Sequence, residues 1–334
     1  MNPFMLQMRT RIHFGAGALA QAGTEAAPLA GDGPVMVLTG GGSVHRHGVF
    51  DQVAASLEAA EVPFFEQPGV QPNPRVDHIR DSIALCRDRG VELILAVGGG
   101  SCIDAAKAIA AGARYDGDVW ELFTGAGRAP AALHVGAVLT LAATGSEFNG
   151  GCVVSDEASA RKLPYLDEML RPAFSLLDPA TTLTLPPRQS AAGVADIVSH
   201  ILEQYFSPTV ATVQDRLAEA LLTVCRDQGP KTLDPGDDLQ ARADIMWASS
   251  LALCGLIGAG KVHDWATHMI EHELSAHYDL THAVGLAILT PAWMTQVLDE
   301  DTAPRLARFG HVMWGLDEHG GMDAARQTIE CTRG

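Results

Sequence analysis

The pattern of apolar residues changes at Pro186–Pro187, and this change most limits what the chain can fold into. Before that pair, short apolar stretches that run into glycines, such as VELILAVGGGS, alternate with amphipathic helical patterns. This alternation predicts a parallel sheet covered by helices. After the pair, strand signals nearly vanish, and helical spacing covers residues 188–206, 211–228, 238–258, 262–276, 282–298 and 303–315. We therefore predict an α/β domain with a parallel sheet over residues 1–185, followed by an all-helical domain over residues 186–334.

Length and charge narrow the class of protein. A chain of 334 residues is longer than one hydrophobic core usually supports, which agrees with two domains. A net charge of −17 argues against binding to a nucleic-acid backbone. No apolar run reaches membrane-spanning length, the N-terminus lacks the apolar segment of a signal peptide, and six scattered cysteines indicate reduced thiols. We expect a cytoplasmic protein with no membrane or nucleic-acid partner.

Two glycine runs, Gly40–Ser43 and Gly98–Ser101, each follow a predicted strand. Neither is a GxGxxG or a P-loop fingerprint. The second run opens a helix, and we predict Ser101 as its N-cap, with Asp104 three residues further on completing a capping box. Either run alone is compatible with a simple tight turn. Two runs at successive strand ends favour phosphate or nucleotide binding, because glycine turns and helix N-termini expose backbone N–H groups.

The residues after the first of these strands bear on the choice of cofactor. An acid at that place usually hydrogen-bonds the 2′-hydroxyl of NAD and repels the 2′-phosphate of NADP. Thr39 is followed only by glycines and Ser43, with no acid. The sequence therefore favours NADP(H) over NAD(H).

A cluster of imidazoles in the second half predicts a metal site. Asp196 and His200 lie four residues apart on one helix face, as do His268 and His272, and His282 opens the next helix. The Asp196–His200 pair alone is more typical of a structural contact, but one carboxylate with several imidazoles suits Fe²⁺ or Zn²⁺. Spacing does not decide which histidines are ligands.

Two further histidines, His263 and His277, have no evident partner in the sequence. We expect each of them to lie at the surface or in a pocket wall rather than to bind the metal.

Four long motifs carry a resemblance that spans essentially the whole chain. They are GGGSCIDAAKAIAAGA, TLAATGSEFN, LDPATTLTLPPRQSAAGVADIVSHILEQYF and GLIGAGKVHDWATHMIEHELSAHYDLTHAVGLAILTPAW. In these motifs the chain resembles the iron-containing (group III) alcohol dehydrogenases, and is most similar to their NADPH-dependent butanol dehydrogenase and aldehyde reductase branch. The resemblance implies an architecture like that of dehydroquinate synthase, with residues 1–185 as a Rossmann-like dinucleotide-binding domain and residues 186–334 as an all-helical metal-binding domain. It also implies a small alcohol or aldehyde as substrate, and a homodimer.

The resemblance also implies roles for individual residues. It implies Fe²⁺ or Zn²⁺ as the metal, and His272 near the nicotinamide as a proton relay. The metal would act as a Lewis acid on the substrate oxygen while hydride moves to or from nicotinamide C4. The implied metal ligands are Asp196, His200, His268 and His282, and the implied cofactor-binding residues are Gly41, Gly42, Ser43, Gly98, Gly99, Gly100, Ser101, Asp104, Thr140, Thr144 and Lys162.

The sequence departs from the family pattern in two places. KLPYLDEMLRP, between Lys162 and Pro172, is unusual and predicts a different loop near the cofactor. The chain also stops at DAARQTIECTRG, within a helical pattern, where relatives continue, so we expect the helical domain to lack its last helices.

Two alternatives come from other classes of protein. A lyase of the dehydroquinate synthase type would use the same cofactor and a metal without net cofactor turnover. A non-catalytic nucleotide- or metal-binding protein would bind NADPH without oxidising it.

Overall fold

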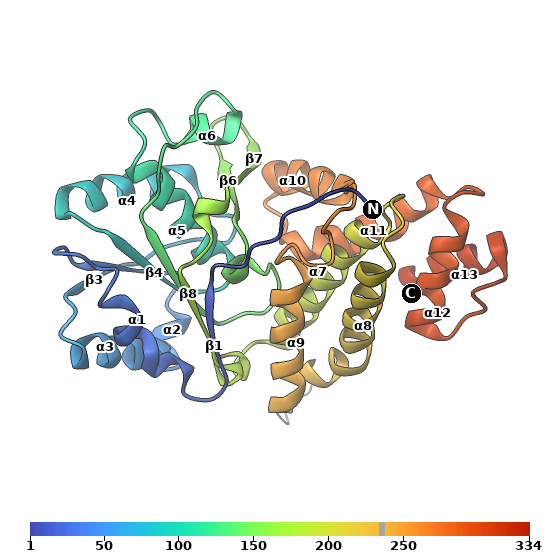
Figure 1. Ribbon diagram of the computed structural model, residues 1–334, viewed down its shortest axis with the longest axis horizontal. Helices are drawn as coiled ribbons and strands as arrows, with labels where there is room; N and C mark the ends of the chain where they lie inside the picture. The colour runs from blue at the N-terminus through green and yellow to red at the C-terminus, as the bar shows by residue number, and fades with distance from the viewer. Residues whose placement is uncertain (234–237) are drawn as a thin grey trace. The chain divides into compact units, whose positions relative to one another are not determined.

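The computed structural model describes residues 1–233 and 238–334, and these form two compact units (Figure 1). One unit comprises Met8–Leu185, and the other comprises Met1–Gln7 together with Pro186–Gly334. The sequence analysis placed the first seven residues in the α/β domain, and this is wrong. The N–H of Asn2 donates to the carbonyl of Gly260 at 2.8 Å, so the arm contacts the helical unit. An extended segment without periodicity does not indicate which unit it will contact.

The first unit is built on a six-stranded parallel sheet, in the order β1-β8-β5-β4-β2-β3. The strands are β1 (Arg11–Phe14), β2 (Val35–Thr39), β3 (Phe64–Gln67), β4 (Leu93–Gly98), β5 (His134–Leu139) and β8 (Phe174–Leu177). The two strands predicted before the glycine runs are β2 and β4. Every residue of β2 and β4 is buried, as expected for central strands covered on both faces.

Helices cover both faces of this sheet, because side chains alternate along each strand. Val35 and Val37 pack in one apolar cluster with Val53 and Leu57 of α3. Met36, between them, points to the opposite face, where its sulfur lies 3.8 Å from that of Cys86 in α4. The helices of this unit are α1 (Ala22–Ala26), α2 (Ser43–Arg46), α3 (Val49–Ala59), α4 (Val76–Arg89), α5 (Gly100–Ala113) and α6 (Trp120–Thr124), with 3-10 turns at Ala18–Gln21, Ser146–Phe148, Glu168–Leu170 and Pro179–Thr182.

The unusual segment after Lys162 contributes a strand to a hairpin that the sequence analysis did not predict. Strands β6 (Gly151–Asp156) and β7 (Arg161–Leu166) pair antiparallel, with Ser155 opposite Lys162. Ala160, at φ 49°, makes the turn between them. The hairpin packs beside α5, the helix that follows the second glycine run.

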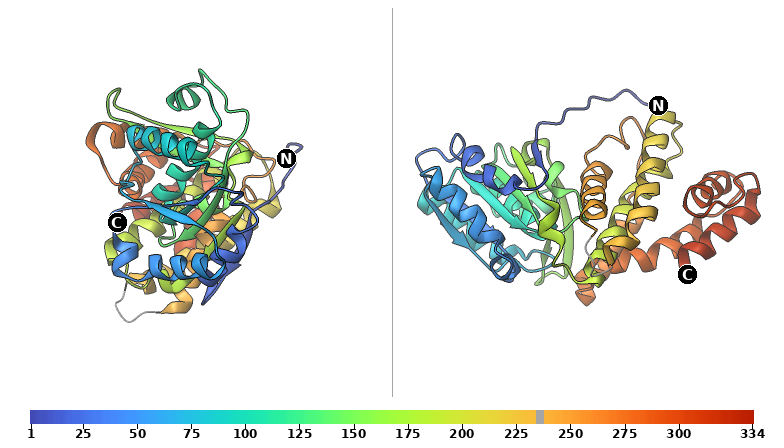
Figure 2. Two further views of the ribbon diagram at one scale, coloured as in Figure 1. Left: turned by 90° about the vertical axis from the view of Figure 1, so that its left-hand side faces the viewer. Right: turned by 90° about the horizontal axis from the view of Figure 1, so that it is seen from below.

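The second unit is helical, as its periodicity predicts. Its elements are α7 (Pro187–Tyr205), α8 (Thr212–Gln228), a 3-10 turn at Pro230–Leu233, α9 (Leu239–Ala252), α10 (Ala266–Tyr278), α11 (His282–Val297), α12 (Ala303–Trp314) and α13 (Gly321–Arg333). Helices α8 and α9 lie side by side in Figure 1, and α12 packs against α13 in the red, C-terminal part of the chain in Figure 2. Within the described residues, no helix is long and apolar enough to cross a membrane.

Proline and glycine explain the helix boundaries of this unit. Helix α7 begins at Pro187, where a missing N–H costs nothing. Helix α9 ends at Ala252, six residues before the predicted 258, because Gly255 adopts a φ of 98° that a helix does not accommodate.

Candidate metal centre and cofactor turns

Three of the predicted ligands, from three helices, come together in the helical unit. Candidate ligand atoms of Asp196, His268 and His282 all lie within 4.8 Å of one another. Nε2 of His282, the first residue of α11, lies 3.9 Å from Oδ1 of Asp196. Asp196 and His268 are buried, whereas the side chain of His282 is partly exposed. A small, mostly buried space therefore has a carboxylate and two imidazoles around it.

His200, the fourth predicted ligand, lies next to this group. Its Nδ1 is 3.7 Å from Oδ1 of Asp196, one turn earlier on α7. Its ring stacks on that of His268 with centroids 4.7 Å apart. The structure thus brings all four predicted residues to one place, with His200 stacked against the side of the tighter group.

Two carboxylates that the sequence analysis missed hold the histidine rings. Nδ1 of His268 bonds to Oε2 of Glu203, and Nδ1 of His282 bonds to Oε2 of Glu271. Both glutamates are buried. The sequence does contain a signal for them, because Glu203 follows His200, and Glu271 follows His268, at the helical spacing of three residues.

The sides of the two rings that face away from the glutamates suit a divalent cation. Each Nδ1 faces a carboxylate and so carries the proton, which leaves the lone pair on Nε2. Nε2 of His268 is buried and, within residues 1–233 and 238–334, has no hydrogen-bond partner. A buried imidazole lone pair near an aspartate, with a carboxylate behind the ring, is the donor set that metal sites use.

The three other histidines considered in the sequence analysis lie outside the group of Asp196, His268 and His282. His272 is buried one turn after His268, with its ring centroid 5.6 Å from that of His282. Its ring nitrogen also lies within 4.8 Å of ligand atoms of Glu271 and His282. His263 is half-buried, with Nε2 2.8 Å from the carbonyl of Gly258, and His277 is exposed.

The second glycine run makes a close turn between β4 and α5. A Cβ at Gly98 would lie 2.5 Å from Sγ of Cys102, and one at Gly100 would lie 2.5 Å from Oγ1 of Thr144. Only glycine fits these two positions without displacing a neighbour. The N–H of Thr140, at the end of β5, donates to the carbonyl of Gly98 at 3.0 Å, which brings the two strand ends together.

The predicted capping box at this turn is wrong. Helix α5 begins at Gly100 with Gly99 as its N-cap and no side-chain capping bond, so Ser101 lies inside the helix. Asp104 instead accepts the hydroxyl of Ser146 at 2.6 Å and the N–H of Val153 at 3.0 Å. Its carboxylate therefore accepts hydrogen bonds from the segment after β5, because that segment packs directly against α5.

A buried ammonium joins the same segment to α5. Nζ of Lys107 donates to Oγ of Ser146 (2.9 Å), Oδ1 of Asn149 (3.1 Å) and the carbonyl of Gly151 (2.7 Å). Burial lowers the pKa of Lys107 to about 8. Burial raises the pKa of Asp104, and the charge of the buried Lys162, on β7, opposes that rise. The predicted cofactor residues Asp104, Thr144 and Lys162 therefore belong to one connected region of this unit.

The first glycine run, after β2, is more open and has charged neighbours. Gly42 adopts a φ of 89°, and a Cβ at Gly41 would meet nothing within 4 Å. Nη1 of Arg46 lies 3.4 Å from where a Cβ of Gly42 would be. Glu66, on the neighbouring strand β3, accepts the hydroxyl of Thr39 at 2.5 Å and lies 2.7 Å from Nε2 of His45. The residues after β2 contain no acid, but strand pairing brings one to the turn.

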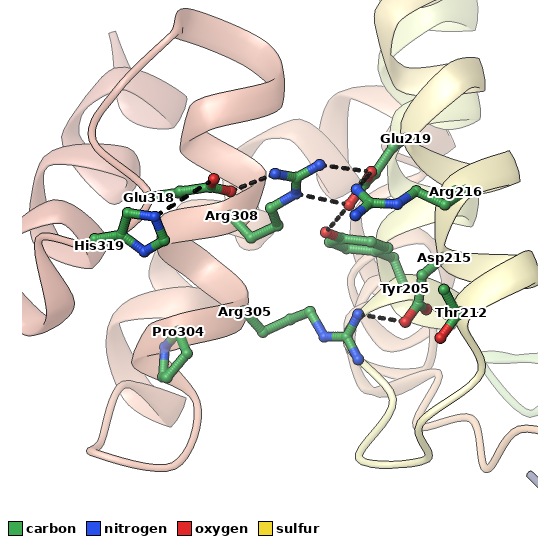
Figure 3. Close-up of a pocket in the computed structure, with 10 residues that line it drawn as sticks. All are labelled: Tyr205, Thr212, Asp215, Arg216, Glu219, Pro304, Arg305, Arg308, Glu318 and His319. Carbon is green, nitrogen blue, oxygen red and sulfur yellow. Dashed lines mark hydrogen bonds and ion pairs between the residues drawn. The ribbon is translucent and has the colours of Figure 1, made fainter.

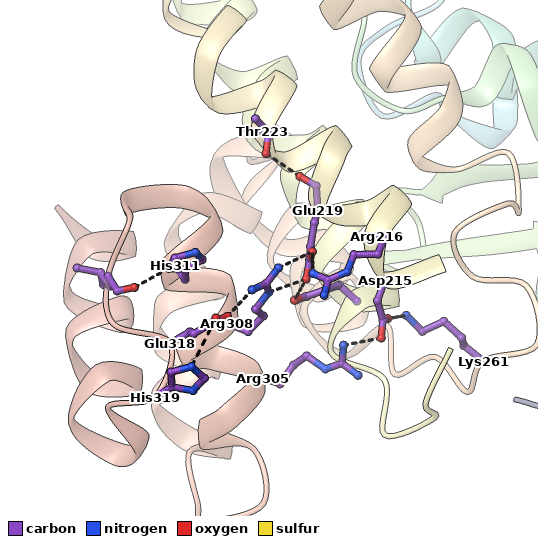
Figure 4. Close-up of polar contacts among 12 residues, drawn as sticks. Asp215, Arg216, Glu219, Thr223, Lys261, Arg305, Arg308, His311, Glu318 and His319 are labelled. Carbon is purple, nitrogen blue, oxygen red and sulfur yellow. Dashed lines mark hydrogen bonds and ion pairs between the residues drawn. The ribbon is translucent and has the colours of Figure 1, made fainter. Parts of the chain in front are cut away.

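A separate cavity of about 400 Å³ lies between α8 and α12 and contains none of the predicted site residues (Figure 3). Arg308 donates to both oxygens of Glu219, at 2.9 and 3.0 Å, and Arg305 donates to Asp215 at 2.8 Å. Tyr205 also donates to Glu219. Because these charges are paired across the helices, the network in Figure 4 joins α12 to α8.

A parallel sheet with glycine turns and a helical unit with a buried aspartate–histidine group suit a metal-dependent nicotinamide dehydrogenase. Residues 9–179 match the family model of iron-containing alcohol dehydrogenase, and residues 190–332 match the model of the C-terminal region of the Fe-containing alcohol dehydrogenase family. The chain belongs to the iron-containing alcohol dehydrogenase family.

Individual relatives are similar over the whole chain. The NADH-dependent butanol dehydrogenase B of Clostridium acetobutylicum is 45% identical, over 100% of this chain and 85% of that protein. The NADPH-dependent aldehyde reductase YqhD of Escherichia coli is 41% identical, over 100% of this chain and 86% of that protein. The crystal structure of NADH-dependent butanol dehydrogenase A from Thermotoga maritima matches with a TM-score of 0.96 at 37% identity, covering 100% of this chain and 83% of that one. The predicted family, fold class and alcohol–aldehyde oxidoreductase reaction are confirmed.

Proposed function

We propose that this chain is an NADP(H)-dependent reductase of short aldehydes that also oxidises the corresponding primary alcohols. The group formed by Asp196, His268 and His282 carries the proposal, because a carboxylate and two imidazoles with candidate ligand atoms within 4.8 Å of one another suit a divalent cation. The similarity to proteins named butanol dehydrogenase and aldehyde reductase supports the substrate class.

In this proposal the ligands of one Fe²⁺ or Zn²⁺ ion are Asp196, His200, His268 and His282. The bound ion supplies Lewis acidity toward the substrate oxygen. Glu203 and Glu271 keep the proton of each ring on Nδ1, so that Nε2 faces the ion. His272 exchanges the proton of the substrate oxygen with solvent, since its ring lies beside that of His282.

The cofactor would bind the α/β unit at the two glycine turns. Backbone N–H groups of Gly98–Ser101 and the N-terminus of α5 suit the diphosphate. Thr140, Thr144 and Lys162 would contact the nicotinamide half, and Asp104 would hold the segment that carries Thr144. When bound there, the cofactor would supply hydride transfer at its nicotinamide ring, which is the cofactor's own chemistry.

The preference for NADP(H) over NAD(H) rests on the first glycine turn. Gly41, Gly42 and Ser43 leave room for a 2′-phosphate, and Arg46 brings a guanidinium to the same turn. Glu66 acts against this preference, but the Thr39 hydroxyl and the His45 ring both engage its carboxylate. A relative named as NADH-dependent and one named as NADPH-dependent are both similar to this chain, so the cofactor preference has to be measured.

The protein is further proposed to act in the cytoplasm as a homodimer, on the strength of the family resemblance. Neither a lyase nor a non-catalytic role is favoured, because the matching relatives carry the names of dehydrogenases and reductases.

The decisive experiment follows NADPH oxidation by the purified chain with butanal. The protein is assayed as isolated, after chelation, and after addition of Fe²⁺ or Zn²⁺, with NADH in parallel. Activity that disappears on chelation and returns with one ion supports the proposal and identifies a working metal. Turnover that chelation leaves unchanged would contradict the metal role, and a higher kcat/KM with NADH would contradict the cofactor preference.

A further inference from the structure

We infer that Glu203 and Glu271 are positioning residues that set the metal affinity of this chain, by turning the Nε2 atoms of His268 and His282 toward Asp196. This inference rests on the proposed function, since it assumes that the two imidazoles are ligands. Both glutamates lie behind the candidate ligands and would not contact the ion.

Glu203 is held in place from several sides. Its Oε1 accepts the hydroxyl of Thr267 at 2.5 Å and the backbone N–H of His268 at 3.2 Å. Its Oε2 is left for Nδ1 of His268. The carboxylate comes from α7 and its donors come from α10, so it joins two helices at the ring. With its carboxylate anchored in this way, the ring of His268 has one preferred orientation.

Glu271, on α10, holds the ring of His282 in the same manner. It is fully buried; its Oε1 accepts the hydroxyl of Ser275, while its Oε2 holds Nδ1 of His282. A Cβ at Gly285, on α11, would lie 2.7 Å from Cγ of Glu271. The glycine therefore leaves the space that the glutamate occupies. Helix α11 approaches α10 at this point because Gly285 has no side chain.

The two glutamates use one physical mechanism twice. A carboxylate that accepts the Nδ1 proton fixes the tautomer, limits ring rotation and makes Nε2 a stronger donor to a cation. Asp196, His268 and His282 come from three different helices, so helix packing alone does not define the ring orientations to the accuracy that a metal site needs. The carboxylates supply this missing constraint.

Glu203→Gln and Glu271→Gln test the inference, because glutamine keeps the shape but removes the charge. The Kd for Zn²⁺ is measured on the full chain by competition with a chromophoric chelator. We expect each variant to bind Zn²⁺ about 10- to 100-fold more weakly. Glu273→Gln is the matched control: Glu273 is exposed on the same helix as Glu271, and we expect its substitution to leave the Kd unchanged. The visible absorption of bound Co²⁺ is expected to shift in the two test variants only, since it reports the ligand arrangement.

The thermal melt of the metal-free protein and its affinity for NADPH show whether each variant is folded. Glu203→Asp is measured as well, because it keeps the charge but draws it back from Nδ1; weaker Zn²⁺ binding is again expected. Wild-type Kd and Co²⁺ spectra in the folded glutamine or aspartate variants would overturn the inference. His268→Ala separates this failure from that of the proposed function: if it also binds Zn²⁺ normally, the metal site itself is wrong.

Discussion

Nε2 of His282 lies 3.9 Å from Oδ1 of Asp196, although the two residues belong to different helices, α11 and α7. This separation is too long for a hydrogen bond. Any two ligand atoms of a tetrahedral Zn²⁺ site lie about 3.3 Å apart, given metal–ligand distances of about 2.0–2.1 Å. The observed pair is somewhat wider, so a shared ion would require a small inward movement of these side chains.

Removal of a ligand imidazole is expected to remove the metal. His268→Ala and His282→Ala should lose most of their bound metal and their activity together, because each deletes a donor from the group. His272→Ala should keep its metal and lose activity, since it lies beside that group. Metal per chain is measured by mass spectrometry after dialysis, with the exposed His277→Ala as control. A wild-type metal content in His268→Ala would show that the ligand set is misassigned.

Arg46→Ala is expected to weaken NADPH binding and to leave NADH binding unchanged. A guanidinium–phosphate hydrogen bond contributes about 1.5–3 kcal/mol, so kcat/KM for NADPH should fall at least about tenfold. Steady-state kinetics with each cofactor measures this effect. Arg128→Ala, exposed in the same unit, is the control. An equal loss with both cofactors would mean that Arg46 does not contact the 2′-phosphate.

Gly100→Ala should destabilise the α/β unit, because its Cβ would lie 2.5 Å from Oγ1 of Thr144. Overpacking of this kind costs about 1–3 kcal/mol. The thermal melt of the cofactor-free protein is measured beside that of Gly41→Ala, whose Cβ would meet nothing within 4 Å. We expect a lower Tm for Gly100→Ala only. Equal melts for the two variants would argue that the turn has room to relax.

The ionised carboxylate of Glu219 is expected to raise the free energy of unfolding of the helical unit at neutral pH, and this contribution should be lost in acid. Burial favours a raised pKa, but hydrogen bonds from Arg308, Arg216 and Tyr205 outweigh it and hold the pKa of Glu219 at about 2, below its usual 4.5. A folded-state pKa below the unfolded one stabilises the fold above about pH 4.5, and this contribution is lost as the pH falls to about 2. Its size is on the order of 1–3 kcal/mol, because solvent screens the partly exposed arginine partners.

Urea unfolding of wild type and Glu219→Gln at pH 7, 5 and 3 measures this contribution. The difference in free energy of unfolding between the two proteins is expected to shrink as the pH falls. Glu58→Gln, at an exposed site, should differ little from wild type at any pH. If the difference in free energy of unfolding stays constant from pH 7 to pH 3, the lowered pKa of Glu219 is contradicted.

The order of the elements and the local geometry of the site follow from short sequence patterns. Apolar runs ending in glycine identified β2 and β4, and helical spacing placed Asp196 and His200 on one face of α7. These features depend on residues a few positions apart, whose relative placement follows from the periods of strand and helix. Local reasoning failed at the capping box, where packing against Ser146 draws Asp104 away from the N-terminus of its helix.

The contacts between side chains of different elements became visible in the three-dimensional structure. Helix and strand packing places Glu203 against His268, Glu271 against His282, and Glu66 of β3 beside the turn after β2. The three-dimensional structure also places the N-terminal arm on the helical unit. Contacts of this kind depend on how helices and strands pack in three dimensions, and that packing is a property of many side chains together rather than of any short motif.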